Sequence, residues 1–407
     1  MKLFYLLLLF LFSFFLNAQI SYTWNGTISS DWDNLLNWTP NGIPQAGDNI
    51  SVPNTANSLI LTSSKNVSNC SFSNSSVNLG GNILQVAGIF SMTGGSCSNG
   101  GLVLQGASAT FSSTTVNTTI NAVCGFVYTL NSTYNDTISF TSTGTANINN
   151  AGNIFNKPLT VINKSIGQVL FGYFVRDVFN DDVKISNQST GNIIFAWNTN
   201  DNIFNGDIIL GSTSNGLIYF ASGGGTVSLA AGKKIKLGEE GFSQGSVLFN
   251  RFTKIGNEAV SLDFGTSNIT FSSVNWSGIL DISAGNIVFN SCVFQDSVVF
   301  NYVPATTTSS SNGGNIFHKT FILNNTGNVQ IDLGRTTRDI FNGDVFINNA
   351  SSTQDIYFSY NSSGNQINGN LYLSNLNYRN VYIGSGGGSS VMAAGKNIYE
   401  GSGGFDS

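Results

Sequence analysis

One short pattern is written repeatedly along this chain of 407 residues. The segment VFNDDVKI at 178–185 returns as IFNGDIIL at 203–210 and as IFNGDVFI at 340–347. Each copy has an aromatic or apolar start, an Asn or its equivalent, two residues that favour turns, and then alternating apolar positions. A pattern that recurs in this way is typical of stacked coils, because one coil of this size cannot bury its own apolar face.

The same pattern holds in further segments when the Asn is taken as position zero. An aromatic or β-branched residue precedes it, apolar residues follow at +3 and +5, and the residue at +4 varies. This alternation indicates a strand with one face in the core and the other in solvent. We expect the aromatic residues to stack in the interior. The zero residues should turn the chain, in a left-handed conformation or as rungs of a side-chain ladder. The clearest pairs are Phe155-Asn156, Phe179-Asn180, Phe204-Asn205, Phe317-His318 and Phe341-Asn342.

These coils of about two dozen residues lie within a longer repeat of roughly 160 residues. The segment ASGGGTVSLAAGKKI at 221–235 recurs as GSGGGSSVMAAGKNI at 384–398. We therefore predict an all-β protein whose residues 58–407 form a β-solenoid, most simply a right-handed parallel β-helix. The long repeats should occupy about 101–260 and 261–407. The second ends at GSGGFDS, so we expect it to be truncated and its open last coil to associate end to end.

Charge is scarce in this sequence, which narrows the classes of partner. Only 9% of the residues are charged, the net charge is -5 and the pI is about 4.8. Nothing in this balance attracts a phosphate backbone, so nucleic acid is excluded as a partner. The hydrophobic content of 41% is too high for a disordered chain.

The first 18 residues read as a leader for export. Lys2 precedes an apolar run that ends near Ala18, and the run is too short to span a bilayer comfortably. We predict a secretory signal peptide over residues 1–18, cleaved after Ala18. The protein would then be extracellular or on the cell surface, without a membrane span. A retained membrane anchor is the alternative.

Residues 19–57 do not follow the repeat and are rich in tryptophan and proline. Trp24, Trp32 and Trp38 fall here. The first coil of a solenoid exposes a strand edge that needs covering, and aromatic and proline residues suit that role. We predict an N-terminal cap, with a carbohydrate-binding tryptophan cluster as the alternative.

The four cysteines carry no metal-binding spacing, since no CxxC occurs. Cys70, Cys97 and Cys124 follow one another at equal intervals, which in a solenoid suggests a column through neighbouring coils. We expect buried, small apolar side chains there, with one disulfide between neighbours left open. Cys292 stands apart.

Few residues could carry catalysis. Asp181-Asp182 could be the paired carboxylates of a polysaccharide-cleaving enzyme, but the equivalent places in other coils hold Gly-Asp or Gly-Asn, which indicates a turn. Glu239-Glu240 is a second acidic pair, confined to one coil. His318 is the single histidine and stands at a zero position, so a Ser-His-Asp triad has no choice of base and a multi-histidine metal site is excluded.

Two further features resemble binding motifs without fitting them. The glycine-rich GGGTVSLAAGKK lacks the spacing and the Ser or Thr of a phosphate-binding loop, and no helix is expected after it. Arg176-Asp177 and Arg338-Asp339 precede the motif at equivalent places in the two long repeats. We interpret each as a solvated local ion pair, with a Ca²⁺ or ligand contact by the aspartates as the alternative. No cofactor is expected otherwise.

The entry segment carries a resemblance to a known group of proteins. Its spacing W-x-G-x(5)-W-x(5)-W-x-P, followed by GDNISVP, resembles the N-terminal segment of large secreted β-helix proteins of Bacteroidota. The FNG(D/N) and GGG…AAGK repeats resemble adhesin-like repeat proteins of the same bacteria, which often depend on the type IX secretion system. The resemblance implies a non-enzymatic surface adhesin or stalk that contacts extracellular matrix or glycans. A polysaccharide lyase or glycoside hydrolase on the same fold is the alternative.

Overall fold

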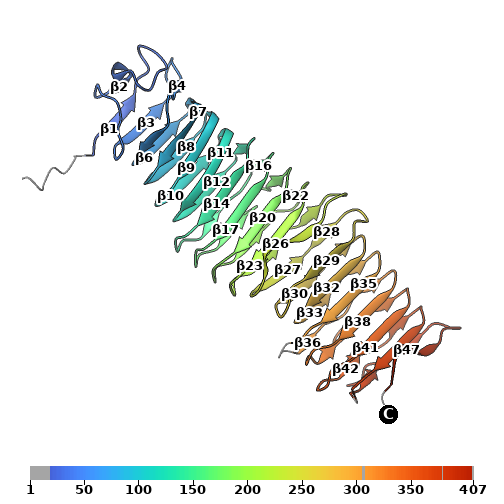
Figure 1. Ribbon diagram of the computed structural model, residues 1–407. Helices are drawn as coiled ribbons and strands as arrows, with labels where there is room; N and C mark the ends of the chain where they lie inside the picture. Colours follow the sequence, from blue (N-terminus) through green and yellow to red (C-terminus); the bar gives the residue numbers. More distant parts are fainter. Residues whose placement is uncertain (1–18, 305–307, 378, 406–407) are drawn as a thin grey trace, which may run out of the picture.

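The computed structural model describes residues 19–304, 308–377 and 379–405. These residues form a rod of about 15 stacked coils, in which the chain advances from one end to the other (Figure 1). Apart from a 3-10 turn, η1 (Leu35–Asn37), the elements are short strands. The prediction of an all-β solenoid is confirmed. Because the predicted signal peptide covers residues 1–18, it lies outside the described residues.

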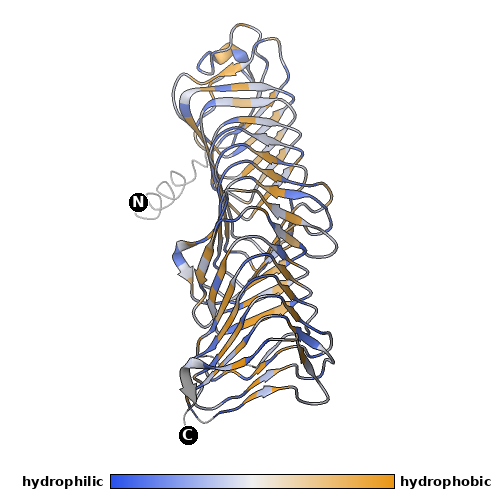
Figure 2. Cartoon of the chain, turned by 90° about the vertical axis from the view of Figure 1, so that its right-hand side faces the viewer, coloured by the Kyte–Doolittle hydropathy of each residue, from blue (hydrophilic) through white to orange (hydrophobic). Residues whose placement is uncertain are grey.

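Each coil contributes strands to three faces, and the strands of successive coils pair in parallel. Only β1 and β2 pair in antiparallel fashion among the described strands. Figure 2 shows the coils from the side, with hydrophobic and hydrophilic residues interspersed along the strands. This interspersion is the alternation that the sequence pattern predicts for strands with one buried face.

The first face consists of three sheets that follow one another along the rod. In spatial order its strands are β2 (Trp38–Thr39), β1 (Ser21–Trp24), β3 (Asn49–Pro53), β6 (Asn69–Ser73), β8 (Ile89–Thr93), β10 (Ser108–Ser112) and β12 (Phe126–Leu130); then β15 (Ile148–Asn149), β18 (Val169–Phe171), β21 (Ile193–Phe195), β24 (Leu217–Phe220), β27 (Ser246–Asn250), β30 (Asn268–Ser272) and β33 (Asn286–Asn290); then β36 (Ser309–Ser310), β39 (Ile331–Asp332), β42 (Ile356–Phe358) and β45 (Val381–Ile383).

The second face is a continuous column of mostly two- and three-residue strands. It begins with β4 (Leu59–Ile60) and the first halves of β7 (Ser76–Val86), β9 (Ser96–Leu104) and β11 (Thr115–Cys124), and continues with β13 (Thr133–Tyr134), β16 (Ile154–Phe155), β19 (Val178–Phe179), β22 (Asn202–Phe204), β25 (Val227–Leu229), β28 (Phe252–Lys254), β31 (Asn275–Trp276), β34 (Val293–Phe294), β37 (Ile316–Phe317), β40 (Ile340–Phe341), β43 (Asn365–Ile367) and β46 (Ser390–Met392).

The third face is interrupted once. Its first part holds β5 (Lys65–Val67), the second halves of β7, β9 and β11, then β14 (Ile138–Ser142), β17 (Leu159–Asn163), β20 (Val183–Asn187), β23 (Ile208–Ser212) and β26 (Ile235–Phe242). Its second part holds β29 (Val260–Asp263), β32 (Leu280–Ala284), β35 (Val298–Tyr302), β38 (Phe321–Asn325), β41 (Val345–Asn349), β44 (Leu371–Asn375) and β47 (Ile398–Phe405).

Both parts of the third face contain a bulged strand at the equivalent place. In β26 the register jumps from Leu237 to Phe242 while the partner strand advances from Leu210 to Ser212. In β47 the register makes the equivalent jump from Glu400 to Phe405. A bulge bends the strand and ends regular pairing. The long repeat of the sequence therefore corresponds to a repeated structural feature, because each copy carries the bulge at the equivalent place.

Aromatic rings fill the interior in two columns. On the second face Phe179 lies between Phe155 and Phe204, with ring centroids 5.4 and 4.5 Å away and nearly parallel planes. Phe317 and Phe341 stack in the same way at 4.9 Å. A second column on the first face contacts these rings edge-on; its members are Phe171, Phe195, Phe220, Phe249 and Phe271.

The tryptophans of the entry segment are packed away from solvent. Trp24, Trp32 and Trp38 are at most 1% exposed. Trp38 contacts the other two edge-on at 5.0 and 4.9 Å, and its Nε1 donates to the Trp32 carbonyl at 2.8 Å. Buried rings offer no face to a sugar. The alternative of a carbohydrate-binding tryptophan cluster is therefore wrong, because these rings belong to the core.

The expected cysteine column is also wrong, although the cysteines are buried and free. Cys70 pairs in register with Phe90, so a coil is about 20 residues long here. The wider cysteine spacing exceeds one coil and carries each cysteine to a different strand and face: β6, β9 and the end of β11. Burial raises the pKa of the Cys97 thiol to about 12, which makes it inert.

No helix among the described residues has the length and apolarity needed to cross a bilayer.

Candidate functional site

The asparagines at position zero form a ladder along the outside of the second face. Asn180 donates from Nδ2 to Oδ1 of Asn156 at 2.7 Å, and Asn205 donates to Asn180 at 2.8 Å. The same bond joins Asn368 to Asn342 at 2.8 Å. Each amide satisfies its neighbour, so these residues hold coils together. His318 occupies the same column and is exposed.

A second ladder is buried at the corner that precedes the second face. Asp177 Oδ1 accepts hydrogen bonds from the backbone N–H of Asn153 at 2.6 Å and from its side-chain amide at 3.0 Å. The Asp177 N–H in turn donates to Asn202 Oδ1 at 2.9 Å. Each side chain thus caps the backbone of the preceding coil. The long repeat copies the arrangement, since Asn315 donates to Asp339 Oδ1 and Asp339 N–H donates to Asn365.

This ladder corrects the interpretation of the two Arg-Asp pairs. Asp177 and Asp339 are fully buried, whereas Arg176 and Arg338 are exposed. In both copies the arginine is open to solvent and the aspartate is enclosed in the corner before the strand, so the two charges separate instead of forming a solvated pair. Burial raises the pKa of Asp177 to about 7 and that of Asp339 to about 6. No group of three or more His, Cys, Asp or Glu side chains able to hold a metal occurs in the described part of the chain.

The Asp181-Asp182 pair serves the turn between the second and third faces. Asp181 accepts from the N–H of Asp182 at 2.8 Å. Asp182 accepts from the N–H of Asp207 in the next coil, also at 2.8 Å. Asp344 has the same role toward the N–H of Asn370. Carboxylates and amides both accept this bond, which explains why the position tolerates either.

The Glu239-Glu240 pair lies in the bulge of β26, and Glu240 folds back across the third face. Its carboxylate lies 3.4 Å from Lys184 Nζ and over Gly211, where an added Cβ would meet the Glu240 side chain at 2.4 Å. Hydrogen bonds and the nearby Lys184 hold the pKa of Glu240 below its usual value despite partial burial. Glu240 is therefore ionised at neutral pH.

Replacing Lys184 tests whether its ion pair with Glu240 contributes to stability. Its side chain is 40% exposed, and an exposed ion pair contributes little. We expect Lys184→Ser to change the free energy of unfolding by no more than about 0.5 kcal/mol. Urea unfolding followed by circular dichroism measures this. A loss of several kcal/mol would mean that the assignment of the outer face is wrong.

Sequence reasoning missed Lys254, which interrupts the interior column of the second face. It pairs in register between Leu229 and Trp276, and its side chain is 0% exposed. Nζ donates to the carbonyls of Gly256 and Ser277 at 2.9 and 3.0 Å and lies 3.5 Å from Glu258 Oε2. Desolvation lowers its pKa. The sequence signal that could have identified this residue is a lysine at a repeat position where the neighbouring coils have Leu and Trp.

The glycine-rich segment at 221–226 turns the chain closely around the coil below. Gly223 has φ +67°, and a Cβ there would meet the carbonyl of Trp197 at 2.3 Å. The next element is the strand β25, so no helix dipole faces these backbone amides. The segment is a tight corner and does not resemble a phosphate site in structure.

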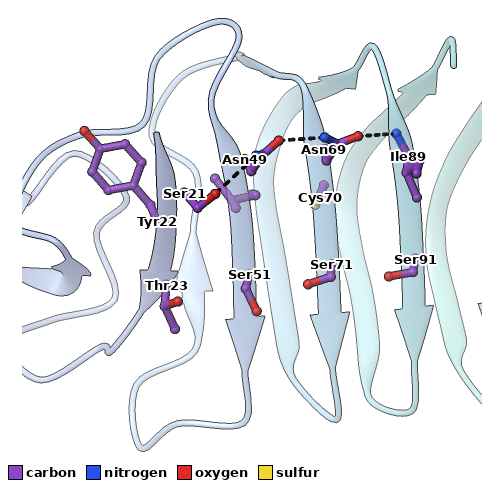
Figure 3. Close-up of a pocket in the computed structure, with 11 residues that line it drawn as sticks. Ser21, Tyr22, Thr23, Asn49, Ser51, Asn69, Cys70, Ser71, Ile89 and Ser91 are labelled. Atoms are coloured by element: carbon purple, nitrogen blue, oxygen red, sulfur yellow. Dashed lines mark hydrogen bonds between the residues drawn. The ribbon is translucent and has the colours of Figure 1, made fainter. Parts of the chain in front are cut away.

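The first face carries a shallow groove near the N-terminal end of the rod. Its volume is about 360 Å³, and residues of β1, β3, β6 and β8 line it. Ser51, Ser71 and Ser91 stand in register across these strands and point outward (Figure 3). Their hydroxyls have no hydrogen-bond partner within the described residues.

An amide chain borders this row of hydroxyls. Asn49 Nδ2 donates to Ser21 Oγ at 3.2 Å, Asn69 Nδ2 donates to Asn49 Oδ1 at 2.6 Å, and the Ile89 N–H donates to Asn69 Oδ1 (Figure 3). The side chains lining the groove carry no formal charge. The groove can therefore offer hydroxyl and amide hydrogen bonds at the regular spacing of the strands, about 4.8 Å.

Comparison with known proteins finds no matching family model, no matching curated protein and no matching solved structure.

Proposed function

We propose that the protein is an exported, rod-shaped surface protein that binds neutral glycans along its first face and does not catalyse a reaction. The observation that carries the proposal is the in-register row of free hydroxyls at Ser51, Ser71 and Ser91 beside the amide chain. A neutral polysaccharide is a periodic chain of hydroxyl groups. A periodic row of uncharged donors and acceptors matches that chemistry and requires no desolvation of charge.

Two features of the sequence agree with this proposal. The leader expected at residues 1–18 would place the rod outside the cell, where glycans are abundant. The scarcity of charge leaves the outer faces covered largely by Ser, Thr and Asn. The resemblance to adhesin-like repeat proteins of Bacteroidota points in the same direction.

No observation favours the alternative of a polysaccharide lyase or hydrolase. A glycosidase acid needs a raised pKa and contact with the substrate. Asp177 and Asp339 have the raised pKa but are fully buried. Hydrogen bonds and Lys184 lower the pKa of Glu240, and the contact with Lys236 lowers that of Asp207. We therefore propose the binding function alone.

Ser71→Arg tests the proposed face. The substitution places a long charged side chain in the middle of the groove, and we expect it to reduce binding to neutral gluco-, manno- and galacto-oligosaccharides about tenfold or more. Thr160→Arg, on the outer side of β17 in the third face, is the matched control and should bind like the parent protein. Glycan arrays followed by calorimetry measure both. Equal binding by parent and Ser71→Arg, or no binding of neutral sugars by the parent, would refute the proposal.

A further inference from the structure

A second groove lies on the second face, near the C-terminal end of the rod. Its volume is about 250 Å³, and it is lined by Arg338, Gly364, Gln366, Asn368, Val391 and Ala393. These residues come from the corner before β40, from β43 and from the segment around β46. Three successive coils therefore build the groove, and the regular stacking of the solenoid fixes their spacing.

The amides in this groove are already oriented. Gln366 Nε2 donates to Asn368 Oδ1 at 3.0 Å, and Asn368 Nδ2 donates to Asn342 Oδ1 at 2.8 Å. These bonds leave the Gln366 oxygen and further amide hydrogens available to a ligand. Val391 is 57% exposed and supplies an apolar surface beside them. Groups fixed before binding lose little entropy when the ligand arrives.

Arg338 gives the groove an uncompensated positive charge. Within residues 19–304, 308–377 and 379–405, no ion pair includes Arg338. The neighbouring Asp339 turns inward to the buried ladder and is fully covered. A guanidinium that is exposed, unpaired and set among neutral amides is suited to a carboxylate or a sulfate.

The first long repeat contains an altered copy of the same place. Arg176 corresponds to Arg338, but Asp201 takes the place of Gly364 and Ile203 takes the place of Gln366. Gly364 and Asp201 both have positive φ, at +75° and +61°. A carboxylate at 201 would repel an anion beside Arg176, and the amide of Gln366 is missing there. The chemistry of the groove therefore belongs to the second repeat alone.

We propose that the groove at Arg338 binds an acidic sugar residue of a polysaccharide. The Arg338 guanidinium holds the anionic group, Gln366 and Asn368 exchange hydrogen bonds with the sugar hydroxyls, and the C–H face of the ring lies on Val391 and Ala393. This site goes beyond the neutral-glycan binding proposed for the first face, and it uses a different face and different residues.

Three variants of the full chain test the site. Arg338→Ala removes the guanidinium, and Gly364→Asp introduces the carboxylate that the first repeat carries at Asp201. We expect each to weaken binding of a uronic acid oligosaccharide about 10- to 100-fold. Arg176→Ala is the matched control and should leave that affinity unchanged. Binding is measured by calorimetry at low salt, with the melting temperature recorded to show that each variant is folded.

The ligands used in the measurement separate the possible outcomes. Uronate and sulfated oligosaccharides are compared at equal charge, which decides whether carboxylate or sulfate is the preferred anion. Binding of either that is lost in folded Arg338→Ala and Gly364→Asp supports the site. The proposal would be overturned if parent, Arg338→Ala and Arg176→Ala bound the acidic oligosaccharide with equal affinity. It would also be overturned if the parent preferred an uncharged oligosaccharide to the acidic one. Ser71→Arg should bind the acidic oligosaccharide normally, so failure at one face is distinguishable from failure at the other.

Discussion

Phe179→Ala is expected to lower the free energy of unfolding by about 3–5 kcal/mol. Phe179 is 0% exposed and lies between the parallel rings of Phe155 and Phe204, with Phe171 and Phe195 edge-on beside it. Removing the ring opens a cavity between coils whose backbones are held by hydrogen bonds on three faces. Such a frame cannot collapse far enough to refill the space.

The damage should be confined to the coils around the substitution. Each coil contacts mainly its neighbours, so limited proteolysis should accelerate near 155–210 while 340–373 stays protected. Asn180→Ala is the matched comparison, because it removes only rungs of the outer ladder and should cost about 1 kcal/mol. Equal effects of the two substitutions, or uniform loss of protection along the rod, would contradict the stacked-column description.

Asp339→Asn is expected to stabilise the second long repeat above about pH 6. Desolvation raises the pKa of Asp339 from 3.8 to about 6 in the folded protein. Oδ1 accepts two hydrogen bonds from Asn315, but the buried Oδ2 has no partner within the described residues. An ionised Asp339 is thus buried with an unsatisfied oxygen, and an amide of the same shape removes that charge.

The direction of the pH dependence follows from the raised pKa. Between about pH 4 and pH 6 the folded chain holds a proton at Asp339 that the unfolded chain has released, so stability falls as the pH rises through this window. The total change is on the order of 3 kcal/mol. Urea midpoints between pH 4 and 8 should show this decline in the parent and its reduction in Asp339→Asn. A variant no more stable than the parent at pH 7.5 would refute this account.

Asp177 supplies the matched control for that experiment. Its Oδ2 accepts a hydrogen bond from the N–H of Gly172, so asparagine at 177 would place a donor against a donor unless its oxygen turned there. Asp177→Asn should therefore gain less stability at neutral pH than Asp339→Asn, although the pKa of Asp177 is the higher one. The buried N–H of Gly172 needs an acceptor, which explains an aspartate at 177. No donor faces the Oδ2 of Asp339 within the described residues, so that position has no such need.

The pattern around Phe179-Asn180 was sufficient to predict the coil, the buried ring and the strand that follows, because neighbouring coils repeat one local geometry. The cysteines show where such reasoning fails. Cys70, Cys97 and Cys124 are evenly spaced, but the coils near them are shorter than their interval, and only the register of paired strands reveals this. Equal spacing predicts a column only when it equals the coil length.

The grooves were not predictable from the sequence for a different reason. Nothing in the sequence distinguishes Ser51, Ser71 and Ser91 from other serines. They form a row of hydroxyls only because three neighbouring strands align them. Arg338 and Asp339 form an apparent ion pair in the sequence, and only burial of Asp339 shows that Arg338 is unpaired. Lys254 and Glu240 likewise depend on contacts between coils, which a single repeat unit does not contain.

The interruption of the third face also determines how the rod carries load. Between β26 and β29 no strand pairing continues, while β25 pairs with β28 and β27 pairs with β30 on the other two faces. Phe242 and Phe264 contact each other across the gap at 5.0 Å. Tension along the axis is therefore borne at this level by two ladders of hydrogen bonds instead of three. The first face is likewise divided between β12 and β15 and between β33 and β36, so the molecule is mechanically a series of stiff segments joined where one ladder is interrupted.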